Sequence, residues 1–446
     1  MPTSIFSIAR SGLAASRTSL ELTAQNIANA GNADYSRRTL TQGELVLIGS
    51  IGINQADALG GVRPGTIERA ESGLVQRQAR DAGSALAAAE AEFFALREAE
   101  SAIETSGVFT GLVDFEAALT RLEGNPLEPA LRVSALESAR SLASNFRVAN
   151  GAIASARTLV QGEASAELLT VNELAAELAT INRDLVGARE GTAGRAALLD
   201  ARDAALRGLS EQFAIVPTIN ANGTADVALA GTPQVALVTG ATAQTVSLSF
   251  AADGTASFAV GATSFAPAGG AFAGRAEALE QIAGLQTDLD ALAASAIGIA
   301  NTAQGNGVGT DGTPGQPLFA GSGAGNITVV LASADGLATA PAGSPAGSRD
   351  TGNLAALLGA LGASTGPAAG ADALLLNLSS RVAALQTRTD GLGIVASTAE
   401  AELLRETGVD LDDEAANLVR LQQAFEANSR VIQVAAELFD TILSLR

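Results

Sequence analysis

The chain of 446 residues contains no cysteine, no histidine, no lysine and no tryptophan. The absence of cysteine and histidine excludes thiolate and imidazole metal sites, cysteine nucleophiles and histidine-based catalytic triads. A serine nucleophile without histidine would need a lysine base, which is also absent. Disulfides are excluded as well, so cysteine pairing says nothing about the redox compartment. We therefore expect no enzyme, no metal and no cofactor.

Basic residues are scarce relative to acidic ones: 27 arginines stand against 47 Asp and Glu, and the net charge is −20. Nucleic-acid binding would require a basic patch, and none is visible. No run of about 18 apolar residues is free of charges, so we expect no membrane-spanning helix. The start, Met1 to Arg10, lacks a basic segment followed by an apolar one, which predicts no cleaved signal peptide.

Aromatic residues make up only 3% of the chain, whereas it holds 48 glycines and abundant alanine. Alanine has the highest helix propensity, and small side chains let helices approach closely. This composition predicts long packed helices with Gly-rich connections. It is unfavourable for a deep ligand pocket lined by aromatic groups.

Both ends of the chain carry an apolar residue at every seventh position, a period typical of helices that pack lengthwise. The second seam near the N-terminus is weak, with Ala9, Ser16 and Thr23. Each end therefore buries little alone, and we expect both to be poorly ordered in a free subunit and ordered in an assembly. The predicted assembly interface comprises Phe6, Leu13, Leu20, Ile27, Leu411, Leu418, Leu421, Phe425, Ile432, Phe439 and Ile442, with Ala435 in the second C-terminal seam.

Helical periodicity and its Gly and Pro interruptions predict the order of the remaining elements. Extended segments are expected at Leu45–Ile48 and Ile51–Ile53, and a turn at Arg63–Gly65. Asp410 is a plausible N-cap of the last helix, with acidic residues in its first turn. The predicted helices cover residues 4–30, 67–105, 112–123, 128–185, 193–213, 275–302, 353–361, 374–406 and 411–445.

The pattern changes to alternating β-branched and small polar residues between Ile215 and about Phe272. Asn222-Gly223 and Asp253-Gly254 predict two hairpin turns. Four strands are expected there, and a fifth further on: Val227–Leu229, Val235–Val238, Val246–Phe250, Ala256–Val260 and Ile327–Leu331. Residues 333–372 are rich in Ala, Gly, Ser and Pro and predict a surface loop around a short helix.

The predicted fold is therefore mainly α with a smaller β part. N- and C-terminal helices form a coiled-coil terminal domain, next to a central helical-bundle domain with an inserted small β subdomain. The predicted segments are an N-terminal helix with an extended connector at 1–66, the first half of the helical domain at 67–213, and the β subdomain at 214–273. A helix, a Gly-rich loop and a short strand follow at 274–372, and the C-terminal helices at 373–446.

Three clusters suggest sites on first inspection. Asp410, Asp412 and Glu414 alternate like calcium ligands, but a calcium loop needs Gly at its sixth position and Glu at its twelfth, and this segment continues as helix. The run 305–309 is Gly-rich, yet no Gly-Lys-Ser/Thr follows it as a phosphate loop requires. Glu402, Glu406 and Asp410 lie four residues apart, as on a solvated helix face. We predict no site at any of them.

The residue motifs at the two ends are more specific than their seven-residue apolar period. The N-terminal segment holds Asn26, Ile27, Ala28, Asn29, Tyr35 and Ser36, and the C-terminal segment holds Glu414, Asn417, Gln422, Gln423, Ala427 and Asn428. These motifs resemble the terminal signature of the bacterial flagellar axial proteins, and the C-terminal one is most similar to the hook–filament junction proteins, the first of the hook-associated group. The resemblance is weakest in 214–273 and 320–370. This chain also has Ala33-Asp34 where the family usually has Pro-Gly, and Phe425 where it usually has Tyr.

The resemblance implies a structural protein that polymerises at the tip of the flagellar hook through its terminal helices and joins hook to filament. Its implied partners are other copies in a helical ring, the hook protein, the second junction protein beside the filament, and a cytoplasmic export chaperone at the C-terminal helix. Nucleic acid and membrane are not expected partners. The implied location is the extracellular flagellum, reached through the type III export apparatus. Alternatives are a hook protein or other axial component, or a secreted enzyme or adhesin with axial-type ends.

Overall fold

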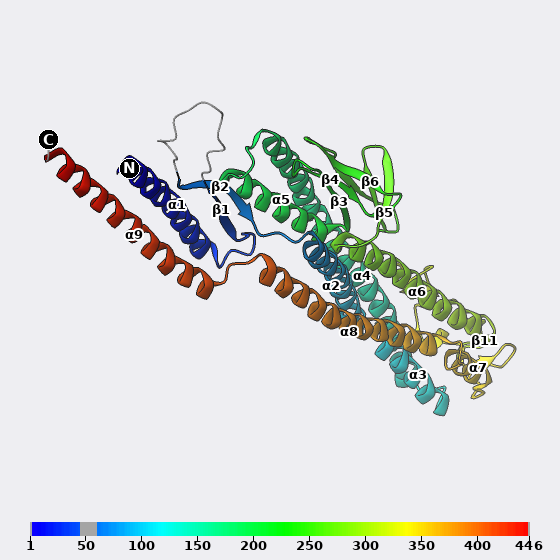
Figure 1. Cartoon of the computed structure of the whole chain (residues 1–446). Coiled ribbons are helices and arrows are strands. Elements are labelled where there is room, and N and C mark those ends of the chain that lie inside the picture. Colours follow the sequence, from blue (N-terminus) through cyan, green and yellow to red (C-terminus); the bar gives the residue numbers. More distant parts are fainter. Residues whose placement is uncertain (1, 45–59, 445–446) are drawn as a thin grey trace. The chain divides into compact units, whose positions relative to one another are not determined.

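A computed structural model describes residues 2–44 and 60–444 of the chain (Figure 1). Helices make up 65% of it, which confirms the mainly α fold with a smaller β part. The chain divides into two compact units. The first contains Met1–Ala85, Thr170–Val246 and Gly393–Arg446, and the second contains Leu86–Leu169 and Ser247–Leu392.

The helices lie close to the segments predicted from the sequence. Breaks fall at Gly107, at Asn125-Pro126 and at Gly408, as the Gly and Pro punctuation indicates. Residues Ala334–Gly336 add one 3-10 turn, η1. The α-helices are α1 (Pro2–Asn29), α2 (Gly73–Ser106), α3 (Val108–Gly124), α4 (Pro129–Gly187), α5 (Ala193–Gln212), α6 (Ala271–Gly305), α7 (Gly352–Leu361), α8 (Pro367–Thr407) and α9 (Leu411–Ser444).

In the first unit, the terminal helices α1 and α9 pack lengthwise and antiparallel, so both chain ends lie at the same end of the pair (Figure 1). Gly12 of α1 lies directly against the side chain of Asn428, where a Cβ would come within 2.8 Å of Asn428 Oδ1. The predicted N-cap of α9 is confirmed, because Asp410 Oδ1 accepts from the backbone N–H of Asp412 at 2.9 Å and of Asp413 at 3.2 Å.

The connector after α1 corrects the prediction for residues 63–69. Strand β1 (Arg38–Glu44) pairs antiparallel with β2 (Val62–Arg69), so the turn expected at Arg63–Gly65 and the helix start expected near residue 67 are wrong. The register shifts between Leu40 and Gln42, and the Thr41 hydroxyl accepts from Thr66 N at 2.8 Å in this bulge. Proline is tolerated in such an edge strand because the ladder does not need its missing N–H. The extended segments predicted at 45–48 and 51–53 lie outside the described residues.

The rest of the first unit's β structure is a four-stranded antiparallel sheet packed beside α5. Its strand order is β3 (Ile215–Ile219), β4 (Ala225–Leu229), β6 (Val235–Thr239) and β7 (Thr242–Ala243), and β5 (Gly231–Thr232) lies between β4 and β6 in sequence. The turn predicted at Asn222-Gly223 is confirmed, with Gly223 at φ 84°. Asn182 of α4 fastens this sheet by donating to the carbonyl of Ala225 at 2.8 Å and accepting from its N–H at 2.9 Å.

The second unit contains strands β8 (Val246–Phe250), β9 (Ala256–Val260) and β10 (Thr263–Pro267) as neighbours in one sheet. The turn predicted at Asp253-Gly254 joins β8 to β9, with Gly254 at φ 91°. Two short pairs complete the β structure of the described residues in this unit: β11 (Gly307–Val308) with β14 (Ala340–Pro341), and β12 (Phe319–Ala320) with β13 (Thr328–Val329).

The core of the second unit is built from the apolar faces of α2, α3, α4, α6, α7 and α8. Phe115 and Phe319 meet edge to face inside it, 6.1 Å apart between ring centroids. Arg132 is fully buried and organises the loop around η1, donating to the carbonyls of Pro126 at 2.7 Å and Leu337 at 2.9 Å. Burial lowers the pKa of Arg132 from its usual value. These bonds to backbone carbonyls hold a Gly/Ala-rich loop that has few large apolar side chains.

Close helix approach at Gly274 gives a stability prediction for the second unit. A Cβ at this position of α6 would lie 2.0 Å from the carbonyl oxygen of Ala88, whereas a Cβ at Gly284 of the same helix would meet nothing within 4 Å. Gly274→Ala should therefore lower the free energy of unfolding by about 1–3 kcal/mol. Gly284→Ala should leave it unchanged or raise it by up to about 1 kcal/mol, because alanine favours helix. Denaturant unfolding of both variants measures this, and equal effects would refute the close approach.

Candidate functional site

Asn26 of α1 is the centre of a buried cluster that joins both chain ends. Its Nδ2 donates to Glu414 Oε1 of α9 at 2.9 Å and to the Arg38 carbonyl at 2.9 Å. Its Oδ1 accepts from the Tyr35 hydroxyl at 2.8 Å and from Arg38 N at 3.1 Å. A carboxamide has two donors and one acceptor oxygen with two lone pairs, so all of its capacity is used. Three segments are thereby held at one point, and two of them lie 388 residues apart in sequence.

Tyr35 and Arg38 extend the cluster toward α5. The Arg38 guanidinium lies over the Tyr35 ring at 4.6 Å and donates to Asp200 Oδ2 at 2.6 Å. Burial raises the pKa of Tyr35, although nearby Arg38 acts in the opposite direction. The phenol therefore stays protonated at neutral pH and remains a donor to Asn26. The cation–aromatic contact adds to the ion pair of the buried Arg38 side chain.

A second arginine continues the network on β2. Arg69 Nε lies 2.7 Å from Asp200 Oδ1, and the same guanidinium pairs with Asp203. Arg202 also pairs with Asp203 at 2.7 Å and donates to the Gly223 carbonyl at 2.7 Å. This network was not predictable from the sequence, because Arg and Asp on a helix such as α5 have the pattern of a solvated face. Nothing in one sequence distinguishes them from exposed ion pairs.

The structure brings some of the predicted motif residues together and leaves others apart. Asn26, Tyr35 and Glu414 meet in the cluster, and Ser36 is buried beside it. Asn417 donates to Thr23 Oγ1 at 3.1 Å, and Asn428 lies against Gly12. The partly buried motif residues are Ile27 and Asn29, and the exposed ones are Ala28, Gln422, Gln423 and Ala427.

The predicted seam residues are only partly covered within one chain. On α1 the buried residues are instead the small or neighbouring ones: Ala9, Ala15, Ser16, Leu22, Thr23 and Asn26. Seam residues Leu13, Leu20, Ile27, Leu418, Leu421, Phe425 and Ile432 are half-buried, whereas Phe6, Leu411 and Phe439 are exposed and Ala435 is buried. The Ile442 side chain lies outside the described residues. The seam role in assembly stays a prediction.

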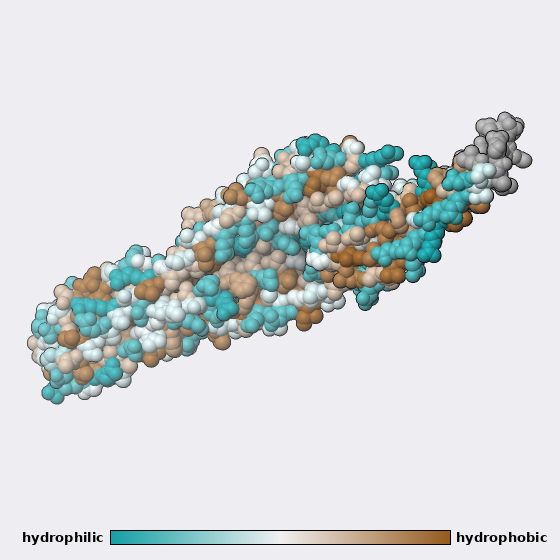
Figure 2. Space-filling model, turned by 90° about the vertical axis from the view of Figure 1, so that its left-hand side faces the viewer, coloured by the Kyte–Doolittle hydropathy of each residue, from teal (hydrophilic) through white to brown (hydrophobic). Residues whose placement is uncertain are grey.

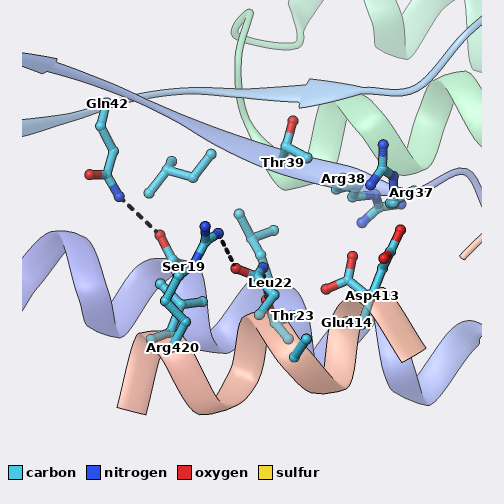
Figure 3. Close-up of a pocket in the computed structure, with 14 residues that line it drawn as sticks. Ser19, Leu22, Thr23, Arg37, Arg38, Thr39, Gln42, Asp413, Glu414 and Arg420 are labelled. Atoms are coloured by element: carbon cyan, nitrogen blue, oxygen red, sulfur yellow. Dashed lines mark hydrogen bonds between the residues drawn. The ribbon is translucent and has the colours of Figure 1, made fainter. Parts of the chain in front are cut away.

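A groove of about 490 Å³ lies between α1, β1 and the start of α9 (Figure 3). Arg37 and Arg38 line one wall, and Asp413 and Glu414 face them from the first turn of α9. Gln42 donates to Ser19 Oγ at 3.3 Å across the other end. Glu414 is 4% exposed, and its Oε2 has no hydrogen-bond partner. The groove can therefore accept a hydrogen bond from a cationic or neutral donor at its acidic wall.

The described residues contain no group of three or more His, Cys, Asp or Glu side chains placed to hold a metal ion. Within the same ranges, no helix is long and apolar enough to cross a membrane.

Two family models match the chain. The first, described as the flagellar hook-associated protein FlgK helical domain, matches residues 98–319, about half of the chain. The second, described as the flagellar basal body rod FlgEFG protein C-terminal, matches residues 402–445. The chain belongs to the flagellar hook-associated protein family. The first match also covers residues 214–273, where the sequence resemblance to the hook-associated proteins is weakest.

One solved structure similar to this hook-associated protein is that of the flagellar hook junction protein FlgK from Burkholderia pseudomallei. The two are 22% identical, with a TM-score of 0.49, over 55% of this chain and 46% of that one. The matched region thus spans under half of that protein's length. No curated protein matches this hook-associated protein. Both Glu414 and Asn417 lie inside the rod-type C-terminal match.

Proposed function

We propose that this hook-associated protein joins the flagellar hook to the filament, polymerising at the hook tip through α1 and α9. The observation that supports this is the apolar surface that the terminal pair leaves uncovered. Large apolar side chains are exposed on α1 at Ile5, Phe6 and Ile8, and on α9 at Leu411, Val419, Val431, Val434, Leu438 and Phe439. Apolar side chains also reach the surface in patches among hydrophilic ones in Figure 2. Contiguous exposed apolar surface is typical of interaction sites.

The spacing of the exposed residues on α9 strengthens this inference. Ala416, Val419, Gln423, Ala427, Val431, Val434 and Leu438 are all exposed and follow one another at three or four residues. Residues at this spacing lie on one face of a helix. Six of the seven are apolar, so α9 carries an apolar stripe in addition to the residues that face α1. One apolar face of α9 packs against α1, so the second apolar face can pack against another protein.

The proposed partners follow from this assembly. They are other copies in a helical ring, the hook protein on one side, the second junction protein on the other, and an export chaperone that covers α9 before assembly. The proposed location is the hook–filament junction outside the cell, and the role is structural, without catalysis or a cofactor. The exposed stripe supports a covering chaperone, because such a surface in the cytoplasm favours aggregation.

The position of the protein along isolated flagella tests this function. An epitope inserted after Ala346, in an exposed loop between β14 and α7, leaves the terminal helices unchanged. Antibody–gold should mark a single short band between hook and filament in electron micrographs. Label along the whole hook would favour the hook-protein alternative and contradict the proposal. Untagged cells provide the control for antibody specificity.

A further inference from the structure

The acidic wall of the groove between α1, β1 and α9 has unmatched charge. Asp413 is exposed and forms no ion pair in the described part of the chain, and Glu414 uses only Oε1, toward Asn26. Glu414 Oε2 is buried without a partner. An unpaired buried acceptor raises the free energy of the folded state, because it has lost its hydrogen bonds to water and has no protein donor in their place. The first turn of α9 therefore presents two adjacent carboxylates, Asp413 and Glu414, whose charges no cation pairs with in the described part of the chain.

The arginines of the groove do not supply that donor. Arg38 is held by Asp200 at 2.6 Å, although its Nε has no partner, and Arg420 donates to Asn417 Oδ1 at 2.7 Å. The guanidinium of Arg37 has no partner among residues 2–44 and 60–444, and no ion pair of 4.0 Å or less joins it to Asp413 or Glu414. The charges face each other across an open space (Figure 3).

Unmatched arginines lie at another level of the same helix pair. Arg10 of α1 and Arg430 of α9 are exposed, and neither has a side-chain partner in the described residues, whereas Arg17 pairs with Glu21 at 3.0 Å. Because Gly12 contacts Asn428, the two arginines lie at one level of the antiparallel pair. Arg10 precedes Asn26, and Arg430 follows Glu414, by 16 residues each. That separation is about 24 Å along a helix, too far for pairing within one copy.

We propose that Arg10 and Arg430 of one copy bind Asp413 and Glu414 of the next copy, with the two helix pairs displaced by about 24 Å along their length. This rests on the proposed function and adds the register of the contact between copies. Since the chain has no lysine or histidine, arginine is the cation that a second copy can offer. Its planar fork of five donors can serve two adjacent carboxylates. The contact joins two different surfaces, so it repeats from copy to copy and builds a ring or helix.

Disulfide cross-linking tests this register, because the chain has no cysteine of its own. Ala416 lines the groove and Gln433 is exposed near Arg430, and neither is charged. They lie about 25 Å apart on α9, beyond the roughly 7 Å between Cα atoms that a disulfide can span within one copy. Ala416→Cys with Gln433→Cys should give a ladder of linked copies in oxidised flagella. The control pair is Ala416→Cys with Gln423→Cys. These two positions lie about 10 Å apart along α9, which does not match the proposed displacement of about 24 Å, so this pair should give no ladder.

Charge variants in the Ala416→Cys, Gln433→Cys background test the pairing itself. Arg10→Glu with Arg430→Glu should abolish the ladder, and adding Asp413→Arg should restore it in part. Filament growth is scored in the same cells, which separates the proposed register of the contact from the proposed junction function. Cells with normal filaments but no ladder would overturn the proposed register and leave the junction function standing. A ladder that persists in the double glutamate variant would overturn the pairing. Absence of the wild-type chain from the hook tip would overturn the function.

Discussion

Replacing Leu418 with aspartate is expected to leave cells with hooks but without filaments. Leu418 is half-buried on the side of α9 that packs toward α1, and its remaining surface belongs to the predicted seam. A carboxylate there loses water without gaining a partner, which costs several kcal/mol when the seam closes. The chain should be made and exported, but it should not hold at the hook tip, and filament protein should be lost to the medium. Electron microscopy and immunoblots of cells and medium measure both results.

Gln422→Asp is the matched control, since it adds the same charge one turn further along α9 at an exposed position. It should retain filaments at close to wild-type numbers. The purified Leu418→Asp chain should keep its helix content by circular dichroism, which separates lost assembly from lost folding. Normal filament numbers with Leu418→Asp would show that the contacts that matter lie in the middle of the chain.

Removing the carboxylate of Asp200 is expected to have the largest effect on stability. Asp200 is 8% exposed and lies between the guanidinium groups of Arg38 and Arg69, which are also buried. Asp200→Ala would leave Arg38 without its ion pair and Arg69 with Asp203 alone among its buried partners. Breaking a buried pair in this way costs about 3–5 kcal/mol, because the remaining charge is uncompensated.

The control for this change is Asp184→Ala on α4, where the carboxylate is exposed and 3.6 Å from its neighbour Arg183. Exposed pairs contribute about 0–1 kcal/mol, so this variant should unfold like the wild type. Urea unfolding followed by circular dichroism compares the two. A loss of less than about 1 kcal/mol for Asp200→Ala would mean that water reaches the two arginines after the change.

The helices and most strands were predictable because their signals are local. Gly and Pro mark the breaks around α3, and Asn222-Gly223 specifies the turn between β3 and β4. The start of α9 was predictable for the same reason, since Asp410 supplies a side-chain cap to N–H groups two and three residues later. Such features depend on neighbours within a few residues.

Strand β2 was not predictable, because its extended conformation depends on pairing with β1 and is not indicated by its own sequence. Arg63-Pro64-Gly65 has the composition of a turn, yet it pairs with β1, and a bulge in β2 places Gly65 and Thr66 opposite Thr41. A bulge depends on the partner strand's register, which no local pattern encodes. Arg132 was missed for a related reason, because most of the carbonyls that hold it belong to residues more than 200 positions later in the chain.

For the candidate site, the sequence identified residues but not their arrangement. Asn26, Tyr35 and Glu414 belong to the terminal motifs, yet the motifs do not say that the three side chains share one set of hydrogen bonds. The antiparallel pairing of α1 and α9 brings them together, and it is a property of the folded chain. The seam residues show the opposite case. Their period predicts packing, but the structure buries the small residues Ala15 and Ser16 more completely than Leu13 or Leu20.

The measurement that tests the central claim most directly is where the Leu418→Asp chain is found when it carries the epitope after Ala346. The wild-type tagged chain should label the hook tip, and the Leu418→Asp chain should be in the medium with hook tips unlabelled. The Gln422→Asp chain should label like the wild type. If the Leu418→Asp chain labels hook tips as densely as the wild type, α9 does not hold the protein in the flagellum, and assembly through the terminal helices is contradicted.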